Sequence, residues 1–184
     1  MVAPDLRFII LGEDHAHVNF VRRWLLSEGI SARQIRQKPV AADATGDGGE
    51  KYVRQQFPTE VQSYRAKANH QRIALIVVID ADLDTVARRQ RQLDETLGAL
   101  PRQPAERIAV VVPRRNIETW LTVLLDPSTA DVGEDTDFKH RFRERTTEAC
   151  ASAGPRFAEF LRRGPQPGDL PSLTAVRPEI ARLA

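Results

Sequence analysis

The sequence predicts an α/β fold in which a mostly parallel sheet is flanked by helices. Two short runs, residues 73–79 and 107–112, are almost wholly apolar, as strands covered on both faces require. Helical hydrophobic patterns alternate with these runs, and this order is typical of α/β domains. With 184 residues, 41% of them hydrophobic, the chain is long enough to bury one core.

The first predicted elements are a strand over residues 7–12 and the helix after it. The strand is a short apolar run, and apolar residues then recur at helical spacing over residues 18–25. Gly29 is well placed to end this helix in a left-handed conformation. A short second strand is expected around Ile35.

The middle of the chain begins with a loop of small residues, 41–49. A helix is predicted over residues 50–68, and Pro58 is expected to break or restart it, because proline disfavours helical geometry at Phe57. The apolar run 73–79 follows as the central strand.

Another helix is predicted over residues 85–97, with Asp84 as its N-cap. The last strand, residues 107–112, is expected to stop at Pro113. Asn116 then caps a short apolar helix, which completes a strand–helix–strand–helix order.

Residues 127–184 are predicted to form a helical extension packed on an α/β domain of residues 1–126. A charged helix is expected over residues 138–153, and an amphipathic turn or two over residues 157–161. A proline-rich linker over residues 165–171 and a last helical turn over residues 178–183 are expected to follow.

Composition narrows the functional classes. No apolar run approaches the roughly 20 residues that cross a bilayer, and the N-terminus lacks a signal-peptide layout. A cytoplasmic protein that does not associate with a membrane is therefore expected. The single cysteine, Cys150, excludes an internal disulfide framework and a cysteine-based zinc cage. Of the 27 basic residues, 23 are arginine, which suits phosphate backbones but also follows from a GC-rich genome.

Carboxylates follow three of the predicted strands. Glu13 comes directly after the first strand, Asp80 and Asp82 follow the central one, and Glu118 stands in the first turn of the helix after the last. In an open parallel sheet, sites gather at the carboxyl ends of the strands, which lie about 4.8 Å apart. The sequence therefore predicts a metal-binding acidic cluster at this edge.

The spacing of Asp80 and Asp82 supports this prediction. In extended backbone, residues two apart point the same way, so both carboxylates are expected to face one hard cation. Mg²⁺ takes oxygen ligands, usually one or two carboxylates with substrate phosphate and water. Two such ions about 4 Å apart can activate a water and stabilise the leaving oxygen of a phosphodiester.

Each acid also has an ordinary structural explanation. Glu13 can simply begin a helix, where acids suit the helix dipole. Asp84 suits an N-cap better than a ligand, and Glu118 can cap its helix or pair with Arg114 or Arg115. The conjunction of acids at one edge is what favours the metal site.

The ordered set of residues resembles TOPRIM domains, the fold shared by topoisomerases, DnaG-type primases, recombination-repair proteins and OLD nucleases. TOPRIM domains carry a glutamate after the first strand and Asp-x-Asp after the third, around a magnesium site, and Glu13 and Asp80-Ala-Asp82 match them. Among TOPRIM groups the chain is most similar to small stand-alone RloB-like proteins linked to phage defence. The resemblance spans about residues 7–126, and its further shared-looking stretches are Gly46–Val53, Ala109–Leu121 and, in the tail, Leu170–Leu173.

The resemblance implies a TOPRIM-like (Rossmann-like) fold and a nuclease that depends on Mg²⁺ or Mn²⁺ and cuts, or less often joins, DNA or RNA. Asp80 and Asp82 would bind the principal metal. Glu13 would bind metal or act as general base, and Glu118 would complete the site or bind a second ion. RloB-like proteins are associated with an ATPase partner, and this chain has no Walker A sequence of its own. Self-association stays open.

Basic residues near the predicted edge are candidate substrate contacts. Arg114 and Arg115 are expected to steer the phosphate backbone. Lys51, after the glycine-rich residues 46–49, is a further candidate, although those glycines also suit a plain turn. TOPRIM domains usually read Glu-Gly after the first strand, whereas this chain has Glu13-Asp14, which leaves the turn geometry and the number of metals open.

Three other interpretations stay open. His15-Ala-His17 is similar to the His-x-His of hydrolases on (β/α)₈ barrels, which need about 250 residues, or else these histidines begin the first helix near the cluster. A receiver-like phosphoacceptor domain needs a lysine at a later strand end, and none lies between Lys67 and Lys139. A non-catalytic TOPRIM-like module would act only by docking to a partner ATPase.

Overall fold

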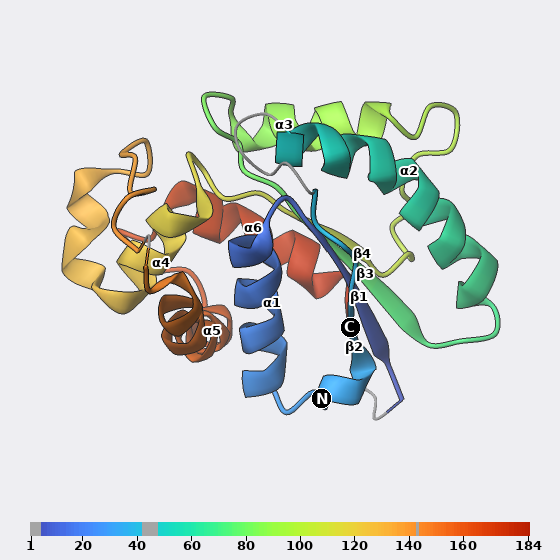
Figure 1. The fold of residues 1–184 in the computed structure, drawn as a ribbon, viewed down its shortest axis with the longest axis horizontal. Coiled ribbons are helices and arrows are strands. Elements are labelled where there is room, and N and C mark those ends of the chain that lie inside the picture. The colour runs from blue at the N-terminus through green and yellow to red at the C-terminus, as the bar shows by residue number, and fades with distance from the viewer. Residues whose placement is uncertain (1–4, 42–47, 143) are drawn as a thin grey trace.

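A computed structural model describes residues 5–41, 48–142 and 144–184 of the chain. Within these residues four strands form one all-parallel sheet in the order β2-β1-β3-β4 (Figure 1). In chain order the strands are β1 (Arg7–Gly12), β2 (Ile35–Gln37), β3 (Ile73–Val78) and β4 (Ile108–Val111). The predicted α/β class is confirmed, and so are the four predicted strands.

The strand β3 lies inside this sheet, and every one of its residues is buried. Gly12 of β1 pairs with Val78 of β3, and Val78 pairs with Val111 of β4. These three strands therefore end at the same level of one edge, and the residues that follow them are brought together there.

Helices cover both faces of the sheet (Figure 1). In chain order the described helices are α1 (His15–Ser27), α2 (Gly48–Ala68), α3 (Val86–Glu95), α4 (Ile117–Leu125), α5 (Thr146–Arg163) and α6 (Pro171–Ala181), with short 3₁₀ helices η1 (Ala32–Gln34) and η2 (Pro127–Val132). On one face, Phe57 of α2 and Leu93 of α3 share a hydrophobic cluster with Leu75. On the other face, residues of α1, α4 and α5 form a second cluster with Ile76.

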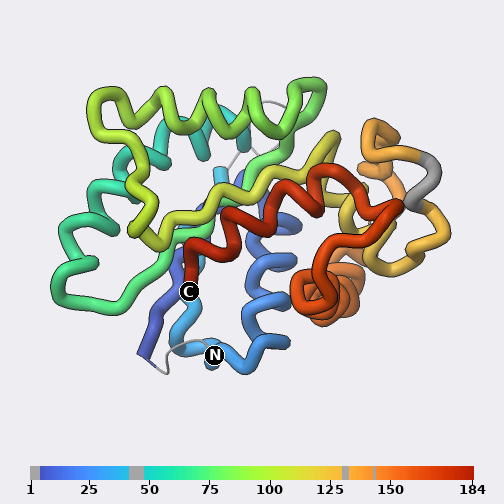
Figure 2. The backbone as a smooth tube through the Cα atoms, turned by 180° about the vertical axis from the view of Figure 1, so that it is seen from behind, coloured from blue at the N-terminus to red at the C-terminus, as the bar shows by residue number. Residues whose placement is uncertain are grey.

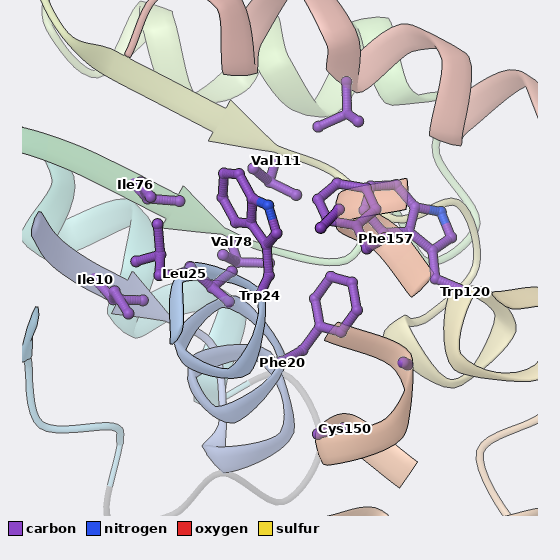
Figure 3. Packing of buried hydrophobic residues seen from close by; sticks show 14 of the residues in the cluster. Ile10, Phe20, Trp24, Leu25, Ile76, Val78, Val111, Trp120, Cys150 and Phe157 are labelled. Atoms are coloured by element: carbon purple, nitrogen blue, oxygen red, sulfur yellow. The ribbon is translucent and has the colours of Figure 1, made fainter. Parts of the chain in front are cut away.

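Aromatic side chains join α1, α4 and α5 in the second cluster (Figure 3). The ring centroid of Phe157 on α5 lies 5.2 Å from that of Phe20 and 5.4 Å from that of Trp24, both on α1. It lies 5.7 Å from that of Trp120 on α4. Such ring pairs add stability beyond the area they bury. The predicted C-terminal extension thus shares the hydrophobic core of the sheet.

The outer edge of β4 is covered by α6 (Figure 2). The Val110 amide donates to Glu179 Oε2 at 2.7 Å, and Arg182 Nε donates to the Ile108 carbonyl at 3.0 Å. An uncovered edge strand offers its backbone groups to any other chain. Side chains of the C-terminal helix occupy them here, so α6 closes the sheet in place of a further strand.

The predicted break at Pro58 is wrong, because α2 runs unbroken through it. Phe57 and Val61 are fully buried on either side of the proline. Their packing keeps the two halves of the helix in line despite the missing backbone N–H. The predicted cap at Asp84 is also wrong, since the side chain of Thr85 accepts from the α3 backbone instead.

Two predicted helix ends are confirmed. Gly29 adopts a left-handed conformation, with φ of 81°, directly after the C-cap of α1. The Asn116 side chain accepts from the Thr119 amide and caps α4.

The predicted charged helix over residues 138–153 is wrong at both ends. Helix α5 begins only at Thr146 and continues to Arg163, because its buried stripe runs on through Phe157. Helix α6 is likewise longer than the single turn predicted over residues 178–183. None of the helices in the described residues combines the length and hydropathy that a bilayer-spanning segment needs.

Gly154 lies where α5 meets the backbone of α1. A Cβ atom there would lie 2.7 Å from the Arg23 carbonyl carbon and 2.7 Å from the Trp24 amide nitrogen. Since these are backbone atoms, the helices would have to separate. We expect Gly154→Ala to lower the free energy of unfolding in urea by about 1–3 kcal/mol, although alanine is the better helix former.

Ser152→Ala, at an exposed position of the same helix, is the control and should change this free energy by less than about 0.5 kcal/mol. If Gly154→Ala proved as stable as the parent protein, the close approach of α1 and α5 would be contradicted.

Candidate metal centre

Glu13 joins the ends of β1 and β3. Its amide donates to the Val78 carbonyl at 3.2 Å, which extends the backbone ladder by one residue. Its carboxylate Oε2 accepts from the Asp80 amide at 3.1 Å. The parallel register thus brings together two of the acids that the sequence placed at this edge.

His17, in the first turn of α1, lies between two carboxylates. Its Nδ1 is 2.7 Å from Asp14 Oδ1, and its Nε2 is 2.8 Å from Asp80 Oδ1. Both ring nitrogens lie against carboxylate oxygens, an arrangement that favours the imidazolium form, in which both nitrogens donate. Burial lowers the pKa of His17, but the charges of Asp80 and Asp14 outweigh it and hold that pKa well above its ordinary value.

Asp14 positions this histidine. Its Oδ1 accepts from the Ala16 amide at 2.7 Å and the His17 amide at 3.1 Å, so that it is the N-cap of α1. Burial raises the pKa of Asp14, but the charge and hydrogen bonds of His17 bring it well below its usual range. Asp14, which stands in place of the glycine of a Glu-Gly pair, therefore has a structural role in this chain.

Glu13, His17 and Asp80 each offer a ligand atom within 4.8 Å of the others, so this group could hold a metal ion. Carboxylate oxygens suit Mg²⁺ or Mn²⁺. Both nitrogens of His17 already face carboxylates, so the ring fits better as the positive partner of Asp80 than as a ligand. The hydrogen bond to His17 involves Asp80 Oδ1.

Glu118 is buried in the first turn of α4 and lies near Asp80. Its pKa is raised to about 7, mainly by burial and also by Asp80 and Asp14, against a backbone hydrogen bond and the charge of His17. Burial likewise raises the pKa of Glu13 to about 7, with His17 opposing and Asp80 adding to the rise. These carboxylates repel one another, and a divalent cation would relieve that repulsion.

The predicted geometry of the Asp-x-Asp pair is wrong. Asp82 has a left-handed backbone, with φ of 53°, so the alternation of an extended strand does not apply to it. Its Oδ2 lies 3.4 Å from Arg89, and 48% of its side chain is exposed. Asp82 still raises the pKa of Glu13, after the larger effect of burial, so it lies near the group without belonging to it.

Two residues at the start of α2 complete the surroundings. Glu50 forms an ion pair with the buried Arg89, which also contacts Asp82. A Cβ atom on Gly49 would lie only 2.5 Å from Glu13 Cγ, so glycine is required for this close approach. Residues 46 and 47 of the glycine-rich stretch lie outside the described residues.

Two of the predicted phosphate contacts are partly exposed and lie beside the chain segment after β3, since Arg115 forms a backbone bridge with Asp82 and Arg114 donates to the Asp84 carbonyl. Arg114 pairs with Asp135 at 2.6 Å, and Arg115 with Asp137 at 3.4 Å. Both aspartates are exposed, and ion pairs with an exposed partner contribute little to stability. Lys51 is exposed on α2.

The sequence pointed to His15 and His17 but gave Asp14 no role. The structure separates the two histidines, since His17 is buried in the site and His15 is exposed. The available signal was an aspartate N-cap three residues before a histidine, which places both side chains on the same helical turn. No comparable sequence pattern pointed to the buried position of Arg89 beside Asp82.

No family model, curated protein or solved structure matches this chain. The site is therefore defined by its own geometry: buried carboxylates from separate strand ends gathered around one histidine.

The raised pKa of Glu118 predicts how stability depends on pH when divalent ions are removed. In the folded chain Glu118 keeps its proton up to about pH 7, whereas in the unfolded chain it loses it near 4.5. The folded state binds more protons between these values, so the free energy of unfolding falls as pH rises through them. We expect Glu118→Gln to reduce that slope, by at most about 1.4 kcal/mol per pH unit, in urea unfolding with chelator present.

Glu95→Gln, which changes an exposed glutamate on α3, is the matched control and should keep the parent slope. Identical slopes in the parent protein and Glu118→Gln would show that Glu118 does not titrate in this range.

Proposed function

We propose that this protein is a metal-dependent nuclease that hydrolyses nucleic-acid phosphodiesters. The observation that carries the proposal is the gathering of Glu13 and Asp80, whose ligand atoms lie within 4.8 Å of one another and of His17, with the buried Glu118 close enough to be influenced by the charge of Asp80. The three acids follow β1, β3 and β4, whose ends lie at the same edge. Oxygen ligands from separate strand ends are the donor set that suits Mg²⁺ or Mn²⁺.

In this proposal Glu13 and Asp80 hold the ion. A bound ion of this kind polarises a phosphoryl oxygen and lowers the pKa of a water. His17 keeps Asp80 in position through Oδ1, at 2.8 Å, and the second carboxylate oxygen of Asp80 would bind the ion. The buried imidazolium also offsets part of the negative charge that the carboxylates bring together.

Glu118 is suited to act as general base. It lies near Asp80 but outside the Glu13–His17–Asp80 group, and its pKa of about 7 matches proton transfer at neutral pH. It would accept a proton from the attacking water as the water oxygen bonds to phosphorus and the bond to the leaving oxygen breaks. Arg114 and Arg115 would exchange their surface aspartates for substrate phosphates.

The resemblance to TOPRIM domains supports the same function. Glu13 follows the first strand in chain order, and Asp80 and Asp82 follow the third. The similarity to RloB-like proteins adds two further proposals, namely a role in phage defence and a partner ATPase.

One observation favours a second candidate, a non-catalytic module acting through a partner. Arg89 binds both Asp82 and Glu50, so the protein itself neutralises part of its acidic set. A module of this kind has no need of a metal, whereas a nuclease does. Metal binding therefore separates the two functions.

Substitution of Asp80 tests the proposed chemistry. We expect Asp80→Asn to abolish cleavage of plasmid, oligonucleotide and transfer RNA substrates assayed with Mg²⁺ or Mn²⁺. Glu118→Gln should slow cleavage by about 10²–10⁴-fold, as expected for loss of a general base. Glu95→Gln should cleave at the parent rate. Cleavage by Asp80→Asn at the parent rate would rule out this site as the origin of the activity.

Thermal unfolding with Mn²⁺ tests whether the site of Glu13, His17 and Asp80 binds a cation. A ligand that binds only the folded state at 100 times its dissociation constant stabilises it by about 2.7 kcal/mol. We expect Mn²⁺ to raise the Tm of the parent protein and of Glu95→Gln, but not that of Asp80→Asn. An unchanged Tm in the parent protein would favour the non-catalytic module.

A further inference from the structure

A basic and aromatic surface precedes α5. It contains six residues, which we call the aromatic-basic segment, and the exposed Glu144 stands among them: Phe138, Lys139, His140, Arg141, Phe142 and Arg145. The four residues with nitrogen-bearing side chains are exposed, and the two phenylalanines are partly exposed. Alternation of aromatic and cationic side chains at a surface is the composition that nucleic-acid strands recognise.

Arg141 lies over two aromatic rings. Its guanidinium carbon is 5.8 Å from the Phe138 ring centroid and 5.9 Å from that of Phe142. The Arg141 amide donates to the Phe138 carbonyl at 2.8 Å, and this turn keeps the two residues together. Phe142 packs against the core, which fixes the base of the turn. Arg141 also lies 3.9 Å from Asp126, in a surface contact of little strength.

Two contacts of flanking residues place the aromatic-basic segment toward the end of the sheet that carries the Glu13–His17–Asp80 group. Asp137, directly before it, accepts from Asn116 Nδ2 at 2.8 Å, and Asn116 stands two residues before Glu118. Just after the segment, in α5, Cys150 Sγ lies 3.6 Å from the carbonyl of Ala16, the neighbour of His17. The chain between α4 and α5 accordingly lies beyond the carboxyl ends of the strands (Figure 1).

We infer that the aromatic-basic segment binds an unpaired stretch of the nucleic-acid substrate, an inference that rests on the proposed function. The bases of a duplex are covered by their neighbours, whereas an unpaired base exposes its face to aromatic rings and guanidinium planes. Phe138 and Arg141 offer such planes next to one another. Lys139 and Arg145 add exposed charge for the phosphates of the same strand.

Binding in the presence of chelator tests this inference without cleavage. The probes are a fluorescein-labelled oligothymidylate and a labelled hairpin duplex of equal length, followed by fluorescence anisotropy. We expect the parent protein to bind oligothymidylate at least about ten-fold more tightly than the hairpin. Phe138→Ala should weaken oligothymidylate binding by about ten-fold and hairpin binding by less than about two-fold, because one stacked base is lost.

Arg141→Lys keeps the charge but removes the planar group, and it should show the same selective loss. Arg36→Ala, which removes an exposed arginine from β2 at the other side of the sheet, should leave both affinities unchanged. Circular dichroism and Tm of each variant show whether it is folded. If Phe138→Ala does not fold, Arg141→Lys still tests the inference.

Equal affinity of the parent protein for both probes, or unchanged oligothymidylate binding in Phe138→Ala and Arg141→Lys, would overturn the inference. Absence of binding to either probe would also overturn it and leave an acidic protein partner as the occupant of this surface. Selective binding of unpaired strands without any cleavage would contradict the nuclease alone. Cleavage restricted to duplexes would contradict this inference alone.

Discussion

Burial of several carboxylates at one edge of a parallel sheet is the constraint on which this structure depends. The register of β1 and β3 places Glu13 against Asp80, and burial raises the free energy of their charged forms. The positive charge among them is that of His17, in contact with both Asp14 and Asp80. Removal of one partner from a buried ion pair typically costs about 3–5 kcal/mol, because the other charge stays uncompensated. The first turn of α1 is therefore part of the site as well as part of the layer that covers the sheet.

Charged side chains also fix both sides of the sheet that carries this centre. Beyond β2, Lys38 Nζ lies 2.7 Å from the buried Glu60 of α2. Beyond β4, Glu179 of α6 accepts from the Val110 amide and from Arg102. These contacts join each outer strand to a helix, away from the carboxyl edge where the acids of the site gather. A rigid sheet fixed on both sides holds the carboxylates of the site in a constant arrangement.

Local patterns were sufficient for much of this fold and for part of the site. The apolar runs predicted β3 and β4, and parallel order then predicted that Glu13 and Asp80 would meet. What could not be predicted depends on contacts between distant residues. The role of His17 depends on Asp80, 63 residues away, and the left-handed Asp82 lies beside Arg89 of the following helix. Continuity of α2 through Pro58 and the start of α5 were missed because packing against the sheet outweighs local preference there.

Burial raises the pKa of Glu13 and Glu118 to about 7, and this affects the competition between protons and a metal ion for these carboxylates. Without a cation, the repulsion among these acids is relieved by binding protons. A metal ion competes with those protons, so its binding releases them and becomes stronger as pH rises through 7. A monovalent ion offsets little of the repulsion, whereas a small divalent ion offsets more of it over the same distances. Because His17 pairs with Asp80, the charge that a bound metal ion would balance in the proposed function is mainly that of Glu13 and Glu118.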